Sequence, residues 1–222
     1  MDMDSALTWS WLQFLTKRRA EHLRSRFGSL DQALSHLDKR VLLELGCKDE
    51  VAKCALERLK SFDVNAYRTR LRALDIRFLS TEDVSYPKKL REIGDPPFFL
   101  YYRGDLSLLD SPCIARVGTR RMSHYGKRVV SHLVPGLVRA GLVTVSGLAM
   151  GIDAEVARVT IAVGGKTVVA LGHGLQSIYP HCNTDLARQI LDTGGLLLSE
   201  FPLDTVPGKF TFPARNRIIA GL

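Results

Sequence analysis

Cys113 to Arg128, CIARVGTRRMSHYGKR, is the stretch around which this chain is organised. The β-prone residues Cys113, Ile114 and Val117 predict a short strand. Gly118 permits a tight turn, and Thr119 or Ser123 can cap a following helix. A strand, a glycine turn and a helix N-terminus form an anion site, because unpaired N–H groups and the positive end of the dipole meet there. The surrounding basic residues favour a phosphate as the ligand. An ordinary turn with solvated basic residues is the alternative, since the stretch lacks the G-x-G-x-x-G fingerprint.

From this stretch onward, short apolar strands alternate with helices. Four apolar runs predict strands buried on both faces, and they begin at Cys113, Leu142, Thr167 and Gly195. Helices are expected over 125–140, over 153–163, and from a cap at Asn183 to Leu191. The alternation predicts an α/β fold with a Rossmann-like, doubly wound, mostly parallel sheet. Ligands of such sheets bind at the C-terminal ends of the strands. The turns at that edge are Gly118-Thr119-Arg120, Ser146-Gly147 and Gly172-His173-Gly174. We therefore expect a phosphate or nucleic-acid site there.

The residues before this core predict two further parts. Helical spacing of apolar residues over 5–75 predicts four or five short helices packed as a small domain over 1–75. Residues 76–110 are expected to form a linker with edge strands. One strand is expected at 76–79. An aromatic run at 98–102 predicts a second strand that adds antiparallel to the main sheet. The core is then residues 111–222.

The composition limits the class of protein. The chain has 222 residues and a formal charge of +8, which favours a polyanionic partner, most simply nucleic acid. A basic but inert surface is the alternative. The spacing of the four cysteines fits neither a zinc site nor a disulfide framework, so reduced thiols in a cytoplasmic protein are expected. No apolar run is long enough to span a bilayer, and the N-terminus lacks a signal peptide. We expect no metal, no cofactor and no membrane partner.

Five segments, in order and with matching gaps, carry a resemblance to a known family. They are VGTRRMSHYG (117–126), SGLAMGID (146–153), ALGHGLQSIYP (170–180), LLSEFP (197–202) and FPARNRIIAGL (212–222). The chain resembles the DNA-processing protein A family (DprA, also called Smf) over essentially its whole length. The resemblance implies a Rossmann-like core preceded by a SAM-like helical domain. It also implies binding of single-stranded DNA without sequence preference, and loading of the RecA recombinase during natural transformation and recombination. The family works as a homodimer and is not known as an enzyme.

The resemblance also implies a single-stranded DNA site. It comprises Gly118, Thr119, Arg120, Ser146, Gly147, Lys209, Phe210, Phe212, Arg215, Asn216 and Arg217. Arg120 would hold one phosphate by a charge-assisted fork, and Lys209 would hold a neighbouring one. Phe212, or Phe210, would offer a ring face to a base. The second glycine turn would add a hydroxyl and backbone N–H groups. One or two members of the 215–217 segment are expected to tie the loop to the sheet instead of contacting DNA.

Three features depart from the family pattern. Ala157 stands where the family usually has histidine, and Arg116 replaces an apolar strand residue, where burial would be costly without a partner. The sequence stops at Leu222, inside the helix that the 215–217 segment begins, so the core is C-terminally incomplete relative to the family. We therefore expect an unpaired sheet edge. We also expect that residues 1–222 do not form the family's dimer.

Two other functions remain open. A nucleotide phosphoribohydrolase can use a similar core, but its PGGxGTxxE motif is missing, since Gly164-Gly165 is followed by Lys166-Thr167. Asp153 and Glu200 lie at strand ends and could pair as catalytic carboxylates; more simply, they cap and brace the turns. A plain mononucleotide-binding module is the third possibility. We expect no enzyme activity, because no catalytic triad order, HExxH motif or metal-ligand cluster is present.

Overall fold

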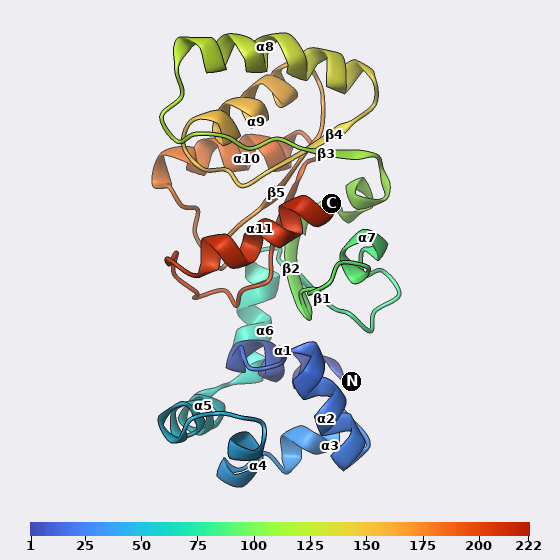
Figure 1. The fold of residues 1–222 in the computed structure, drawn as a ribbon, viewed down its shortest axis with the longest axis vertical. Coiled ribbons are helices and arrows are strands. Elements are labelled where there is room, and N and C mark those ends of the chain that lie inside the picture. Colours follow the sequence, from blue (N-terminus) through green and yellow to red (C-terminus); the bar gives the residue numbers. More distant parts are fainter. The chain divides into compact units, whose positions relative to one another are not determined.

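The computed structural model describes residues 1–222, which form two compact units, Met1–Leu74 and Asp75–Leu222 (Figure 1). The first unit is all-helical, as predicted. Its helices are α1 Met3–Leu12, α2 Lys17–Phe27, α3 Leu30–Ser35, α4 Lys39–Glu44, α5 Asp49–Ser61 and α6 Val64–Ala73. Trp9 is fully buried at its centre, and the indole N–H donates to the Leu30 carbonyl over 3.1 Å. No helix in the chain combines the length and apolar character needed to cross a bilayer.

The second unit is built on a six-stranded sheet. Its strands are β1 Arg77–Ser80, β2 Phe99–Gly104, β3 Cys113–Ala115, β4 Val143–Ser146, β5 Thr167–Ala170 and β6 Leu196–Ser199, in the order β1-β2-β6-β5-β4-β3. The four strands from β3 to β6 are parallel. β2 adds to them antiparallel, with Tyr101 opposite Ser199, and β1 pairs antiparallel with β2. The predicted mostly parallel sheet with an antiparallel aromatic strand is confirmed.

Helices cover both faces of this sheet (Figure 1). They are α7 Lys88–Arg91, α8 His124–Arg139, α9 Ile152–Ala162, α10 Thr184–Asp192 and α11 Thr211–Gly221, with short 3₁₀ turns at Leu106–Asp110 and His181–Asn183. α9 and α10 pack on the face that presents Val169 and Leu197. α11 packs on the opposite face with Ile218. α8 lies against α9, where Val134 meets Val156. The result is the three-layer α/β arrangement of Rossmann-like folds.

Two local predictions were wrong. β3 ends at Ala115, and Val117 is 63% exposed outside the sheet, so this edge strand is not buried on both faces. Asn183 stands at the N-cap position of α10, but its side chain does not cap the helix. The Asn183 amide instead donates to the Leu148 carbonyl over 2.9 Å. Leu148 has a φ of 55°, a left-handed conformation unusual for leucine. The Asn183 amide therefore holds the backbone turn after β4.

Candidate nucleic-acid interface

One buried carboxylate joins the two glycine turns that follow β3 and β4. Asp153 lies in the first turn of α9 and is 5% exposed. Its Oδ1 accepts the Gly118 N–H over 3.2 Å, and its Oδ2 accepts the Gly147 N–H over 3.1 Å. Each oxygen therefore anchors one turn, and the bracing role predicted for Asp153 is confirmed. The Ile152 N–H also donates to the Thr119 carbonyl over 3.1 Å, which adds a backbone link between the turns.

Close packing explains why glycine occupies both turns. A Cβ on Gly118 would lie 2.7 Å from the Ile152 side chain. A Cβ on Gly147 would lie 2.5 Å from the Arg215 guanidinium. Real side-chain contacts of this kind do not fall below 3 Å, so any larger residue would push the neighbour away. The turns are therefore shaped by residues from α9 and α11, far along the chain.

Arg215 lies inside the site and is only 5% exposed. One Nη donates to the carbonyls of Gly147 and Ala170, which joins α11 to the ends of β4 and β5. Burial lowers the pKa of the Arg215 guanidinium; the Asp153 charge raises it in part, and Arg120 lowers it further. Nε has no partner. Because Arg215 is hydrogen-bonded inward, it acts as an internal strut of the site.

Arg217 and Asn216 have different surroundings on the same helix. Arg217 forms a bidentate pair with Glu200, at 2.7 Å and 2.5 Å, and an ion pair with Asp95 at 3.1 Å. Burial pulls the pKa of Arg217 down, but the hydrogen bonds and charge of Glu200 raise it overall. These contacts fasten α11 to the loop before β2 and to the end of β6. Asn216 is exposed on the surface of α11.

A small cleft opens above the two turns. Its volume is about 40 Å³, and its walls include Arg120, Met150, Tyr179 and Phe212 beside Gly147. The Arg120 guanidinium carbon lies 5.5 Å from the centre of the Phe212 ring, which is cation–π distance. The Tyr179 ring centre lies 6.1 Å from that of Phe212, with the planes 39° apart. The cleft thus places one guanidinium beside two aromatic rings.

The remaining predicted residues lie around this cleft in different ways. Ser146 is fully buried at the end of β4, and its hydroxyl has no partner. The Thr119 side chain accepts the Arg121 N–H over 3.1 Å, so it stabilises the turn itself. Lys209 and Phe210 stand at the start of α11, where Phe210 is 87% exposed. The structure therefore gathers Arg120, Gly147, Phe212 and Arg215 around one cleft, with Lys209 and Phe210 on the loop leading into it.

Sequence reasoning missed Tyr179 and Met150. Tyr179 is 46% exposed, and its backbone N–H donates to Nε2 of buried His173 over 3.3 Å. The sequence did contain a signal for Tyr179. It is a tyrosine that precedes a proline and follows a glycine-rich turn at the ligand-binding edge of the sheet. Met150 is 49% exposed in the turn after β4 and carried no such signal. His, Cys, Asp and Glu side chains nowhere gather in a group of three that could hold a metal ion.

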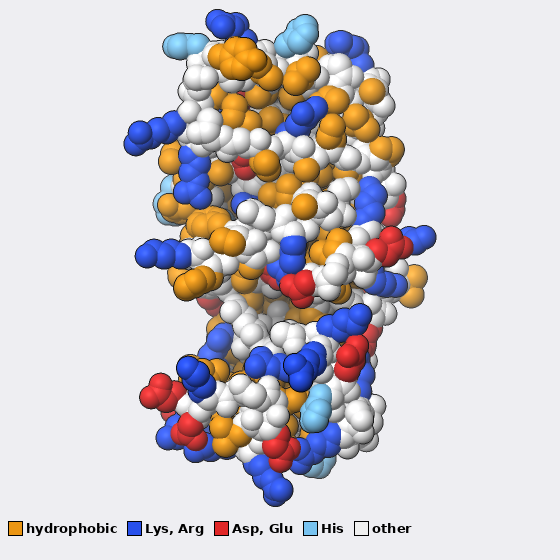
Figure 2. Space-filling view, viewed as in Figure 1, with side chains coloured by type: hydrophobic (Ala, Val, Ile, Leu, Met, Phe, Trp, Pro, Cys, Tyr) orange, Lys and Arg blue, Asp and Glu red, His pale blue; other side chains and the backbone are white.

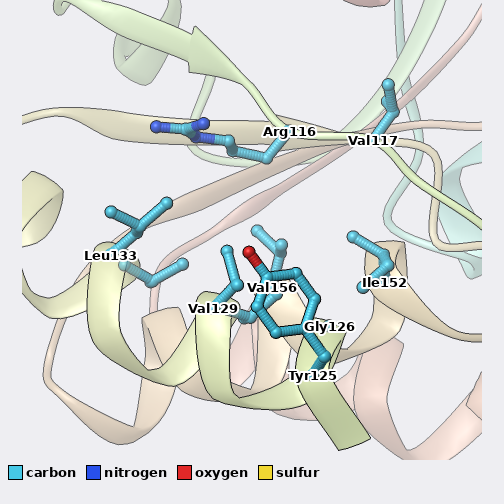
Figure 3. A pocket seen from close by; sticks show the side chains of 10 residues that line it. Arg116, Val117, Tyr125, Gly126, Val129, Leu133, Ile152 and Val156 are labelled. Atoms are coloured by element: carbon cyan, nitrogen blue, oxygen red, sulfur yellow. The ribbon is translucent and has the colours of Figure 1, made fainter. Parts of the chain in front are cut away.

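A second hollow lies beside β3 at the edge of the sheet. It has a volume of about 250 Å³ and is lined mainly by apolar residues of α8 and α9. Figure 3 shows Arg116 extending along the strand toward Leu133, with the Tyr125 ring on the helix side. The Arg116 side chain is half-buried, and its Nε has no partner. Arg116 therefore keeps an uncompensated polar atom at the edge strand. Ala157, the other departure noted above, is fully buried in α9.

Comparison with known proteins identifies the family. Residues 77–222 match the family of DNA recombination-mediator protein A. The chain belongs to the DNA recombination-mediator protein A family. The Smf protein of Synechocystis sp. is 45% identical over 150 residues, which cover 66% of this chain and 37% of that protein. The DNA processing protein DprA of Bacillus subtilis is 46% identical over 138 residues, covering 62% and 46% of the two chains. The chain thus spans about half or less of the length of these curated relatives.

Solved structures in the family have the same fold. The X-ray structure of DprA from Streptococcus pneumoniae has a TM-score of 0.76 and 33% identity, covering 100% of this chain and 75% of that one. A structure of DprA from Helicobacter pylori has a TM-score of 0.57 and 36% identity, covering 65% of each chain. The H. pylori work describes a single-stranded DNA binding mode for that protein. The resemblance drawn from the sequence is therefore confirmed at the level of family and fold.

Proposed function

We propose that this chain binds single-stranded DNA without sequence preference at the cleft between Arg120 and Phe212. The observation that carries the proposal is the Arg120 guanidinium 5.5 Å from the centre of the Phe212 ring, above two glycine turns that a single carboxylate holds together. A guanidinium can bind a phosphate by a bidentate fork. An adjacent ring can stack on any base, because every base has a π-face. Together they hold a strand without reading its sequence.

Lys209 and Phe210 extend this site on the loop before α11. Both are exposed, so they can meet a neighbouring phosphate and a neighbouring base. Arg215 and Arg217 serve the site differently, because the guanidinium of each is used in bonds to other parts of the sheet and its loops. We assign them to positioning and leave Arg120 and Lys209 as the cations that contact phosphate. Tyr179 joins Phe212 as a second ring at the cleft.

The hydrogen bonds of the two carboxylates at this edge of the sheet favour a binding site over a catalytic one. Both oxygens of Asp153 accept N–H groups of the turns, and both oxygens of Glu200 accept from Arg217. A carboxylate occupied in this way is poorly placed to act as a general base or nucleophile. We propose that this chain takes part in DNA uptake and recombination in the cytoplasm by handing the bound strand to the RecA recombinase. The family membership supports this role.

Fluorescence anisotropy with a labelled six-nucleotide oligothymidylate tests the binding site. Arg120→Gln should weaken binding and reduce the slope of log affinity against log salt by about 0.7, the value for one lost phosphate contact on a single strand. Phe212→Ala should weaken binding by about 1–3 kcal/mol with little change in that slope. Arg188→Gln on α10, which removes one exposed charge away from the cleft, is the matched control and should bind as the parent does.

Two results would overturn the proposal. One is an Arg120→Gln variant that keeps the parent's affinity and salt slope. The other is a mononucleotide that displaces the labelled oligonucleotide at concentrations matching the oligonucleotide's own affinity, which would indicate a nucleotide-binding module. Thermal unfolding of Phe212→Ala accompanies the titration, since a Cβ on Gly172 would lie 2.9 Å from this ring and the ring therefore also fills space beside β5. If Phe212→Ala weakens DNA binding while its Tm equals that of the parent, the loss of affinity is assigned to stacking.

A further inference from the structure

The stretch from Ser111 to Ile152 has a one-sided charge. It contains six arginines and lysines and no aspartate or glutamate, whereas the whole chain has 31 basic and 23 acidic residues. The six are Arg116, Arg120, Arg121, Lys127, Arg128 and Arg139. Only Arg120 belongs to the cleft, and most of the remainder lie on or beside α8. The cleft therefore accounts for only one of these six positive charges.

The α8 helix carries three of these six cations on its solvent-exposed surface. Lys127, Arg128 and Arg139 are exposed, and the spacing of 128 and 139 places them on the same side of the helix. His124 and His132 are exposed between them. Figure 1 shows α8 lying along α9. Val130 and Val134 of α8 are buried there with Val156 of α9. In Figure 2, blue and pale-blue side chains project over α8. None of the three cations forms an ion pair, so their charge faces outward uncompensated.

This face is continuous with the cleft. α8 begins at His124, directly after the turn that carries Arg120 and Arg121. Its Ser123 cap accepts the Gly126 N–H over 3.1 Å, so the helix starts immediately beside the turn. A helix of 16 residues extends for about 24 Å, a length that several successive phosphates of a strand occupy. A strand leaving the cleft beside Arg120 would therefore meet cations at both ends of α8.

We propose that the outer face of α8 is a second contact surface for single-stranded DNA, which binds the backbone of the strand beyond the cleft. The proposal rests on the function proposed above and adds to it a path for longer strands. On this surface Lys127, Arg128 and Arg139 are the groups that contact phosphates. The surface therefore adds affinity that depends on strand length and on salt, and adds no sequence preference.

The test compares two oligothymidylates, of 6 and 20 nucleotides, by anisotropy across a range of salt. The triple variant Lys127→Gln, Arg128→Gln, Arg139→Gln removes the cations of this face. Glutamine has a helix propensity close to that of lysine and arginine, so the helix is retained. A control triple, Lys88→Gln, Arg103→Gln, Arg188→Gln, removes the same charge from three other elements. Circular dichroism and thermal unfolding establish that both variants are folded.

The α8 triple should bind the 20-mer at least tenfold more weakly than the parent and reduce its salt slope by about 2, since each lost contact contributes about 0.7. Its affinity for the 6-mer should stay within twofold of the parent, and the control triple should change neither affinity by more than twofold. An unchanged 20-mer affinity would overturn the proposal and leave α8 as a basic surface for another partner, such as an acidic protein. Equal losses for the control triple would also overturn it. A failure of the cleft proposal is distinguishable from this one. In that case the Arg120→Gln variant would bind the 6-mer with the same affinity as the parent.

Discussion

Replacing Asp153 by asparagine tests whether the two glycine turns depend on one buried charge. The change keeps the size of the side chain but turns one oxygen into an amide N–H₂ that faces a glycine N–H. One charge-assisted hydrogen bond is lost, worth about 1.5–3 kcal/mol. The buried guanidinium of Arg215 also loses the negative charge that partly offsets its burial. We expect the free energy of unfolding to fall by about 3 kcal/mol.

For a unit of this size, each kcal/mol corresponds to about 3 °C in Tm, so the expected decrease is roughly 10 °C. The assay is thermal unfolding followed by circular dichroism. Asp185→Asn is the matched control, because it makes the same chemical change at an exposed ion pair with Arg188 on α10. Exposed pairs contribute little, so its Tm should stay close to that of the parent. If Asp153→Asn and Asp185→Asn lower the Tm by the same small amount, the bracing role assigned to Asp153 is refuted.

Two further predictions concern the same region. Gly147→Ala should lower the Tm, because its Cβ would lie 2.5 Å from the Arg215 guanidinium. Gly136→Ala, near the C-terminal end of α8 and with no close neighbour, should raise the Tm slightly. The opposite order of the two Tm changes would contradict the packing argument. Burial lowers the pKa of His173 below its ordinary value of 6.5, although two backbone hydrogen bonds raise it in part. The neutral ring therefore stabilises the fold above pH 6.5, and this contribution is lost as the pH falls below that value. Tm measured at pH 7.5 and 5.5 should fall more for the parent than for His173→Gln, and equal falls would show that His173 is not responsible.

The parallel core was predictable because its signals are local. Each of β4, β5 and β6 is a run of buried residues that closely follows a glycine, and burial on both faces leaves such a run mostly apolar. β3 was predicted less well because it is an edge strand. Its outer side lacks a neighbouring strand, so Val117 and Arg116 follow it without the apolar continuity that marks a central strand.

The parts that sequence reasoning missed depend on contacts between distant residues. Asn183 is a good helix cap by residue type, yet its amide bonds to Leu148, 35 positions away. Arg215 resembles a phosphate ligand in the sequence, but Gly147, 68 positions away, leaves space for its guanidinium inside the sheet edge. Local preference gives way in both cases to a buried hydrogen bond, because an unsatisfied buried polar group is costly. Only the fold brings these partners together.

The charged residues of this edge separate into two groups with different consequences. Asp153 and Arg215 are buried and bonded to turn backbone, so substituting either should change stability and binding together. Arg120 and Lys209 are exposed, so substituting them should change binding and its salt dependence while stability stays constant. An interior fixed in this way keeps the Arg120 turn and the Phe212 ring in place before a strand arrives. Affinity is therefore not spent on ordering the site, which is how a small cleft of one guanidinium and two rings can hold a flexible strand.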